Sequence, residues 1–155
     1  MHKFANQIAT LGPVGTNLPA PGTAGSLVAL PIGFFLLQVS WMTLFIASIL
    51  CLILGVWAAN HYGRSSGKKD ASEVIIDEVA GQWITLLFVP ASLVWVIAAF
   101  IAFRLFDILK PGPVKLAEQL KDGTGVMADD VVAAMLAGMV LLALQVAVAL
   151  NGTTI

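Results

Sequence analysis

Long apolar runs alternate with short polar segments along most of this chain. Five apolar segments are predicted, at about residues 26–38, 41–60, 74–89, 91–109 and 129–150. About 20 residues of helix cross the hydrocarbon core of a bilayer, with a range of ~17–25. The second, fourth and fifth segments meet that length, whereas the first, which contains Pro31, and the third suit partial or tilted spans. The pattern predicts an all-α, polytopic membrane bundle forming one domain over residues 1–155.

Composition supports the same class. Hydrophobic residues make up 59% of the chain and charged residues 11%, with a mean hydropathy of +0.93. Soluble domains have about 45–50% apolar and about 25% charged residues. The net charge of −1 gives no reason to expect a nucleic-acid partner. The single cysteine, Cys51, lies in an apolar run and is expected to be a buried hydrophobe, and without a Cys or His cluster no zinc site is expected.

The segment before the first apolar run has a different character. Residues 2–11 mix polar and apolar side chains and predict a short amphipathic piece at the membrane interface. They lack an apolar core followed by a small-residue cleavage site, so no removable signal peptide is expected. Residues 12–26 contain Pro and Gly so often that they predict a turn rather than a helix, running directly into the first apolar segment.

The charged residues all fall on one side if successive segments cross the membrane in alternating directions. The turns at residues 39–40 and 90–92 and the tail 151–155 carry no charge. The cations of the other face are Lys3, Arg64, Lys68, Lys69, Arg104, Lys110, Lys115 and Lys121. The acids there are Asp70, Glu73, Asp77, Glu78, Asp107, Glu118, Asp122, Asp129 and Asp130. Since positively charged loops favour the cytoplasm, the charged face is predicted to be cytoplasmic.

Five of these acids lie at the ends of apolar segments and form a candidate metal site. Asp77 and Glu78 open the third segment, Asp107 closes the fourth, and Asp129 and Asp130 open the fifth. Mg²⁺ prefers oxygen ligands and commonly combines a few carboxylates with substrate phosphate and water.

Two cations and one turn complete the candidate site. Arg104 and Lys110 flank Asp107 and would hold phosphate oxygens. The Gly-rich turn before the first segment would offer backbone N–H groups and hydroxyls at a helix N-terminus.

Simpler interpretations compete with a metal site. Asp129 and Asp130 could be helix caps, since acids are favoured at N-termini. Asp107, at a C-terminus, could form a local pair with Arg104 or Lys110. The remaining loop acids are expected to be ordinary solvated charges: Asp70, Glu73, Glu118 and Asp122.

Four motifs in order, PGTAGS at 21–26, DEVAGQW at 77–83, FRLFDILKPGP at 103–113 and GVMADDVVA at 125–133, resemble the phosphatidylglycerophosphatase A family. The resemblance covers nearly the whole chain from about residue 11. It implies a Mg²⁺-dependent, multi-pass enzyme of the bacterial inner membrane, with its active site facing the cytoplasm. Such an enzyme removes the terminal phosphate of the phospholipid phosphatidylglycerophosphate, giving phosphatidylglycerol.

The resemblance also implies roles for individual residues. Catalytic and metal-binding roles fall on Asp77, Glu78, Asp107, Asp129 and Asp130. Contacts to the substrate phosphate fall on Gly22, Thr23, Gly25, Ser26, Arg104 and Lys110. Whether a carboxylate or a metal-activated water attacks phosphorus stays open at the level of sequence.

Two other functions are weighed against this one. A lipid phosphotransferase also brings acids and metal to membrane helix ends, but the chain lacks the spaced acidic signature of CDP-alcohol transferases. A small transporter or ion-conducting subunit would place ionisable groups at mid-span, where this chain has mainly Gln145. Small residues at 133–138 would permit close helix packing within or between chains, so the sequence is compatible with a homo-oligomer.

Overall fold

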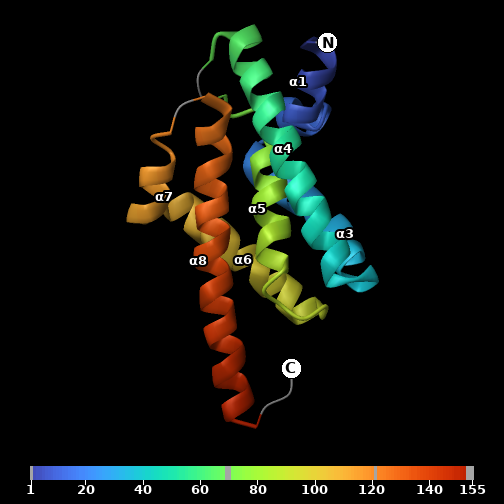
Figure 1. Ribbon diagram of the computed structural model, residues 1–155, viewed down its shortest axis with the longest axis vertical. Helices are drawn as coiled ribbons and strands as arrows, with labels where there is room; N and C mark the ends of the chain where they lie inside the picture. The colour runs from blue at the N-terminus through green and yellow to red at the C-terminus, as the bar shows by residue number, and fades with distance from the viewer. Residues whose placement is uncertain (1, 69–70, 121, 153–155) are drawn as a thin grey trace.

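The computed structural model describes residues 2–68, 71–120 and 122–152, and within these ranges the chain is helical, with no strand (Figure 1). The predicted all-α class is confirmed. The eight helices of the described ranges are α1 (His2–Thr10), α2 (Pro13–Asn17), α3 (Pro21–Val39), α4 (Trp41–Ser66), α5 (Ile76–Leu86), α6 (Leu93–Leu109), α7 (Gly112–Ala117) and α8 (Asp122–Leu150).

Three helices of the described chain are long and apolar enough to cross a membrane: α3, α4 and α8. The first apolar segment is therefore longer than predicted, since α3 has 19 residues. The fourth segment is shorter than predicted, because residues 90–92 form a turn and α6 has only 17 residues. At 11 residues α5 is too short to span and lies among its neighbours instead.

The prediction of a turn over residues 12–26 is wrong for most of this stretch, and only residues 12 and 18–20 lie outside helices. Two helices begin in this stretch, α2 at Pro13 and α3 at Pro21. A proline in the first turn of a helix removes an N–H group that would have no intrahelical partner, so it starts a helix without cost. Gly25 lies in α3 where a Cβ would be 3.1 Å from the Cβ of Ile75, which explains a glycine there by close packing.

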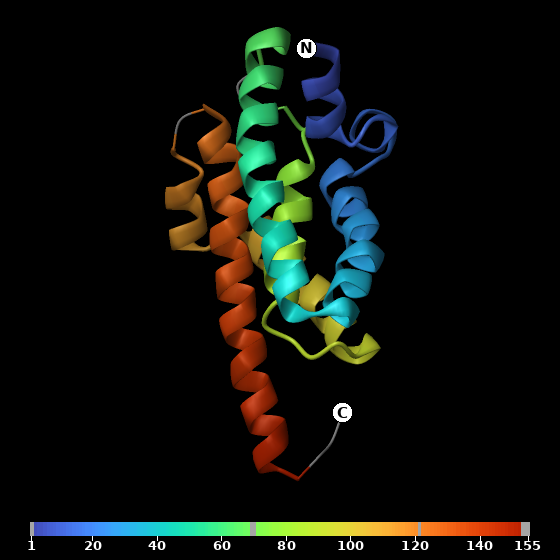
Figure 2. The same ribbon diagram turned by 45° about the vertical axis from the view of Figure 1, so that its right-hand side comes forward.

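The helix α5 lies at the centre of the bundle and packs against α3, α4, α6 and α8 (Figures 1 and 2). Gly81 permits this approach, since a Cβ there would collide with the ring of Phe103 and lie 3.2 Å from the backbone oxygen of Asp130. The small residues of α8 face inward as well, and Gly138 lies directly against Phe88. Close packing by small residues is thus confirmed within the chain.

The outward faces of the long helices are apolar. Phe35, Ile53, Ile101 and Val146 are each about 60% exposed or more. Apolar area left in water costs about 25 cal/mol per Å², so a surface of this kind is typical of contact with lipid. Together with the three helices that are long and apolar enough to span, it indicates a membrane protein. Cys51 is buried, as predicted.

Candidate functional site

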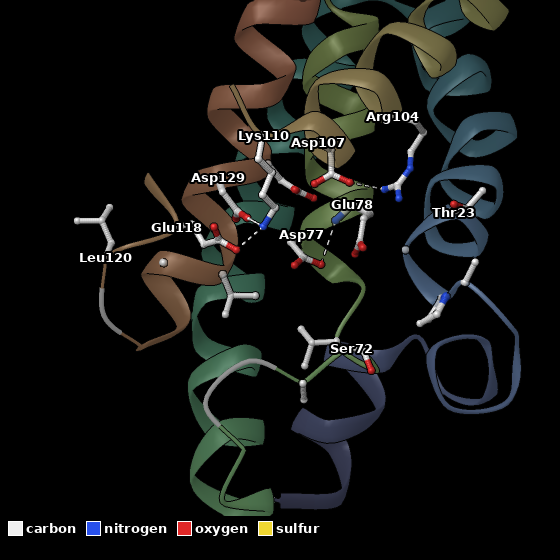
Figure 3. A pocket seen from close by; sticks show the side chains of 18 of the residues that line it. Thr23, Ser72, Asp77, Glu78, Arg104, Asp107, Lys110, Glu118, Leu120 and Asp129 are labelled. Atoms are coloured by element: carbon white, nitrogen blue, oxygen red, sulfur yellow. Dashed lines mark hydrogen bonds and ion pairs between the residues drawn. The ribbon is translucent and has the colours of Figure 1, made fainter. Parts of the chain in front are cut away.

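A cavity of about 480 Å³ lies at the charged end of the bundle, where α3, α5 and α8 begin and α6 ends (Figure 3). Its walls come from segments far apart in the sequence. All five acids of the predicted site line it, together with both predicted phosphate-binding cations. The acids are Asp77, Glu78, Asp107, Asp129 and Asp130, and the cations are Arg104 and Lys110.

Asp77 and Glu78 occupy the first turn of α5, where the helix dipole favours negative charge. The Oδ1 atom of Asp77 accepts a hydrogen bond from the Glu78 N–H at 3.0 Å. Burial raises the pKa of Asp77 well above its ordinary value, and the adjacent Glu78 charge raises it further. The Glu78 carboxylate lies against Gly22 of α3, so closely that a Cβ on Gly22 would collide with it.

Arg104 and Asp107 form an ion pair one turn apart on α6, with 2.7 Å between Nη1 of Arg104 and Oδ2 of Asp107. The local pair considered for Asp107 is therefore present. Arg104 also donates to Oγ of Ser26 on α3 at 3.5 Å, and its buried Nε has no hydrogen-bond partner among the described residues. The guanidinium thus joins two helices and retains an unused donor.

Lys110 caps the end of α6 in a left-handed conformation, with φ of 43°. Its Nζ donates to Oε1 of Glu118 at 2.6 Å and to Oδ2 of Asp129 at 2.9 Å. Burial lowers the pKa of Lys110, but the two carboxylates more than reverse this and raise it, so the ammonium stays charged.

Glu118 is a site residue that the sequence interpretation misses. The sequence predicts a solvated charge, and Glu118 is exposed as predicted, but its carboxylate also pairs with Lys110 and lines the cavity. The Pro111-Gly112-Pro113 break after α6 was a usable signal, because it reverses the chain and lets α7 bring residue 118 back to residue 110.

Asp129 and Asp130 do not open a helix, so the capping interpretation is wrong. The helix α8 begins at Asp122, seven residues earlier, and places both acids about two turns inside it. Gly123 and Gly125 allow this early start. Gly123 donates its N–H to Oδ1 of Asn60 at 2.8 Å, and Cβ atoms at both glycines would collide with neighbouring backbone.

Both α8 acids are buried, Asp129 to 7% exposure and Asp130 to 4%. Oδ1 of Asp129, Oδ2 of Asp130 and Oε2 of Glu78 are buried and accept no hydrogen bond from the part of the chain that the structure describes. A buried carboxylate without a partner is strongly unfavourable. These oxygens therefore have the properties of ligand atoms for a cation.

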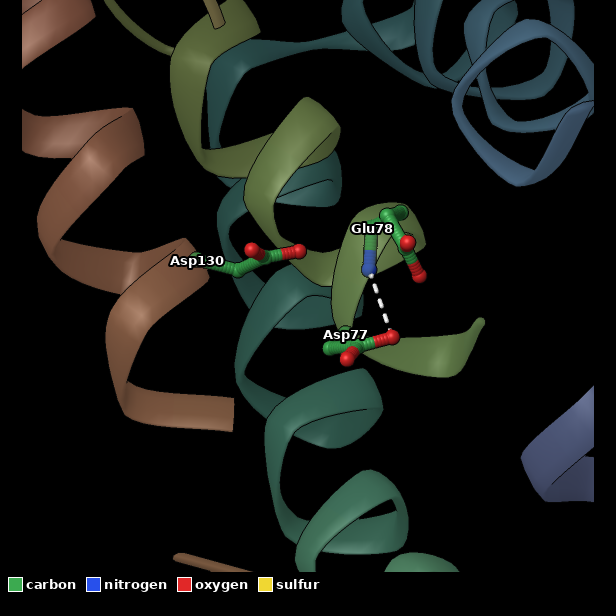
Figure 4. A group of neighbouring side chains, drawn as sticks. All are labelled: Asp77, Glu78 and Asp130. Atoms are coloured by element: carbon green, nitrogen blue, oxygen red, sulfur yellow. Dashed lines mark hydrogen bonds between the residues drawn. The ribbon is translucent and has the colours of Figure 1, made fainter. Parts of the chain in front are cut away.

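The acids form two groups whose candidate ligand atoms lie within 4.8 Å of one another. One contains Asp77, Glu78 and Asp130, and the other contains Asp107, Asp129 and Asp130. Figure 4 shows Asp130 reaching from α8 toward the two acids of α5. An all-oxygen donor set of this kind suits a hard cation such as Mg²⁺.

The residues of the 21–26 motif divide between two positions. Gly22 and Thr23, at the start of α3, line the cavity. Gly25 packs on Ile75, and Ser26 is fully buried, where its Oγ donates to the Gly22 carbonyl at 3.1 Å. Gly25 and Ser26 therefore lie behind the cavity wall, and Ser26 reaches the site only through Arg104.

The other loop acids differ in whether they line the cavity. Glu73 forms an exposed pair with Lys68 at 2.6 Å and is not among the residues that line the cavity. Asp122 is exposed and lines the cavity without belonging to either acidic group. Asp70, predicted to be a solvated charge, lies outside the described residues. Ser72 and Leu120 also line the cavity and were not singled out by sequence (Figure 3).

Comparison with known proteins gives one family. Residues 7–145 match the family model of Phosphatidylglycerophosphatase A. The chain is 41% identical over 130 residues to Phosphatidylglycerophosphatase A of Haemophilus influenzae, covering 82% of this chain and 80% of that protein. It is 32% identical over 123 residues to Phosphatidylglycerophosphatase A of Escherichia coli, covering 78% and 72%.

A further relative has a different name. The chain is 46% identical over 123 residues to a Bacteroides thetaiotaomicron protein provisionally named phosphatidylinositol-3-phosphatase, covering 74% of this chain and 76% of that protein. No solved structure gives a significant match.

Proposed function

The chain belongs to the phosphatidylglycerophosphatase A family, and on this basis we propose that it removes the terminal phosphate of phosphatidylglycerophosphate with Mg²⁺ as cofactor. The product is phosphatidylglycerol, and the reaction is hydrolysis of a phosphoric monoester. The observation that carries the proposal is the convergence of five carboxylates from α5, α6 and α8 on one cavity that also holds Arg104 and Lys110.

The acids supply the binding site for Mg²⁺. Its ligands would be drawn from the cavity carboxylates whose buried oxygens have no partner within the described ranges, including Glu78, Asp129 and Asp130. When bound, Mg²⁺ supplies positive charge that stabilises the phosphoryl oxygens and acidifies water.

The cations and the start of α3 bind and orient the substrate phosphate. Contacts to Asp107 and Ser26 fix the orientation of the Arg104 guanidinium. Its Nε has no partner among the described residues, so this planar group retains a donor for a phosphate oxygen. Lys110 is a second, fully charged donor. The Gly22 and Thr23 N–H groups lie in the first turn of α3, where helix N–H groups favour an anion.

The bundle places this chemistry beside lipid. The glycerophosphate head of the substrate enters the cavity while its acyl chains remain against the apolar outer faces of the helices. The positive residues at the same end support an orientation with the site on the cytoplasmic side of a bacterial inner membrane. The enzyme thus acts on a phospholipid without removing it from the bilayer.

The decisive test is release of inorganic phosphate by the purified protein in mixed micelles. Phosphatidylglycerophosphate is expected to be hydrolysed with Mg²⁺ present and not after treatment with EDTA. Phosphatidylinositol 3-phosphate is the necessary second substrate, because the Bacteroides thetaiotaomicron relative is provisionally named for it. If kcat/KM is higher for phosphatidylinositol 3-phosphate than for phosphatidylglycerophosphate, the proposed substrate is wrong.

Two outcomes would contradict the phosphatase altogether. Cation flux in proteoliposomes without release of phosphate from either lipid would favour a transporter or an ion-conducting subunit. Transfer of the phosphoryl or phosphatidyl group to an alcohol acceptor, rather than to water, would favour a lipid phosphotransferase.

A further inference from the structure

One residue belongs to both acidic groups of the cavity. Asp130 lies with Asp77 and Glu78 on one side and with Asp107 and Asp129 on the other. It extends from α8 between the ends of α5 and α6, as Figure 4 shows for the α5 side. The five acids therefore form two adjoining donor sets with a common member.

We propose that the cavity binds two divalent cations side by side, one in each acidic group, with Asp130 as their shared ligand. The proposal rests on the proposed phosphatase function and specifies the metal content of its site. Shared carboxylates are a feature of paired metal sites in which two ions together stabilise the attacking and leaving oxygens of a phosphoryl transfer.

The first argument is the set of oxygens without partners. Asp130 is 96% buried, since 4% of it is exposed, and its Oδ2 has no hydrogen-bond partner in the described chain. Each group contains a further unpartnered oxygen among those residues, Oε2 of Glu78 in one and Oδ1 of Asp129 in the other. A single ion in either group would leave the unpartnered oxygen of the other group unsatisfied.

The second argument is how the cations hold the acids of the second group. Arg104 binds Oδ2 of Asp107, and Lys110 binds Oδ2 of Asp129. Each contact fixes one oxygen of a carboxylate and leaves the other oxygen for a ligand, as outer contacts do around known metal sites. For Asp129 the remaining oxygen is the buried, unpartnered Oδ1.

The third argument is charge. When all are ionised, the seven acids that line the cavity outweigh its two cations by five negative charges. One divalent ion leaves three negative charges, which would repel a phosphate monoester dianion. A second ion leaves one negative charge and so reduces this repulsion further.

Mn²⁺ is the probe that tests the proposal, because it replaces Mg²⁺ and has an electron paramagnetic resonance spectrum. The purified full chain, stripped with EDTA and placed in nanodiscs, is titrated with Mn²⁺. We expect two equivalents bound at saturation and a spectrum with magnetic coupling between the ions. Binding of one equivalent, or of two without coupling, overturns the proposal.

Three variants test which residues bind the two ions. Asp130→Asn is expected to abolish the coupled spectrum and to remove at least one equivalent, whereas Asp77→Asn is expected to lose coupling and retain one equivalent. Asp122→Asn is the matched control on the same helix, since Asp122 lines the cavity outside both groups. It should bind like the unmodified protein. If a variant does not fold, the stoichiometry of the unmodified protein still decides.

Phosphate release is measured on the same samples to separate the two proposals. Activity with one bound ion leaves the phosphatase intact and overturns the paired site. Two coupled ions without hydrolysis of either lipid support the paired site and contradict the proposed function.

Discussion

The two ends of the bundle differ in how their polar side chains are paired. At the uncharged end, Trp41 donates to the Leu87 carbonyl at 3.0 Å and Gln145 donates to the Phe88 carbonyl at 2.8 Å. At the charged end, oxygens of Glu78, Asp129 and Asp130 are buried without a partner among the described residues.

This difference distinguishes polar groups that stabilise the fold from polar groups that can bind a ligand. Polar groups in a membrane protein are expected to be satisfied internally. Trp41 and Gln145 at the uncharged end meet this expectation through backbone carbonyls, whereas the buried Oγ of Ser92 there has no partner among the described residues. At the charged end, the unpartnered carboxylate oxygens of Glu78, Asp129 and Asp130 belong to residues that line one cavity, and only that of Glu73 lies outside its described lining. We infer that the uncharged end stabilises the bundle and that the charged end is arranged for a ligand.

Metal removal is expected to have the largest effect at the charged end. Treatment with EDTA should reduce phosphate release to background, and Mg²⁺ should restore it. Mg²⁺ bound at the proposed site of the folded protein should also stabilise the fold, by about 2.7 kcal/mol at a concentration 100 times its Kd. Thermal unfolding with and without Mg²⁺ measures this, and full activity in EDTA would contradict it.

Asp107→Asn is expected to have the second-largest effect on activity. Removing this charge weakens one acidic group and the ion pair that orients Arg104. We expect kcat to fall by on the order of 10³-fold, equivalent to about 4 kcal/mol of transition-state stabilisation. Asp122→Asn serves as the control for loss of an acid at the cavity wall. Near-normal activity of a folded Asp107→Asn protein would remove Asp107 from the catalytic set.

Gly22→Ala tests the contact between α3 and α5. The added Cβ would collide with the Glu78 carboxylate and lie 3.3 Å from Nη2 of Arg104. Small displacements of catalytic groups can cost roughly 10²-fold in rate, so we expect a loss of about 10–100-fold with little change in unfolding temperature. Gly112→Ala, where no atom lies within 4 Å of the added Cβ, is the matched control.

Glu118→Gln should have a smaller effect. The change releases Lys110 from one of its two carboxylates and leaves the contact to Asp129. A partly exposed ion pair contributes about 0.2–1 kcal/mol, so KM should change by no more than about fivefold, with kcat nearly constant. Steady-state kinetics separate the two parameters, and a large fall in kcat would assign Glu118 a direct role.

Gln145→Leu at the uncharged end should leave activity unchanged. It removes the hydrogen bond to the Phe88 carbonyl, and such bonds within membranes average about 0.6 kcal/mol. A small decrease in unfolding temperature at constant kcat/KM is the expected result. A marked loss of activity would show that the two ends are coupled, and their separate roles would no longer hold.

Much of the fold and of the site follows from sequence because membrane insertion imposes strong local rules. Long apolar runs identify the helices, and the confinement of charge to one side of the predicted bundle brings the acids to one end. The errors concern helix starts. Residues 12–26 and 122–125 contain the glycines and prolines that are typical of turns, yet the structure is helical through most of them.

The reason is that several of these glycines serve contacts between distant segments. The absence of a Cβ lets Ile75 pack against Gly25 and Glu78 against Gly22. In the same way, the backbone near Asn60 packs against Gly123. Local propensity rules treat such residues only as helix breakers, because the partner that requires them lies about 50 to 60 residues away in the chain.

The class of protein, the charged end and the identity of the acids follow from the amino-acid sequence, since composition and apolar length are properties of the chain alone. Three features of the site arise only when the helices pack: Asp129 and Asp130 lie inside α8, Glu118 returns to Lys110, and Asp130 is common to two acidic groups. Those features depend on how helices approach in space, and distances between side chains on different helices are not encoded in any local pattern.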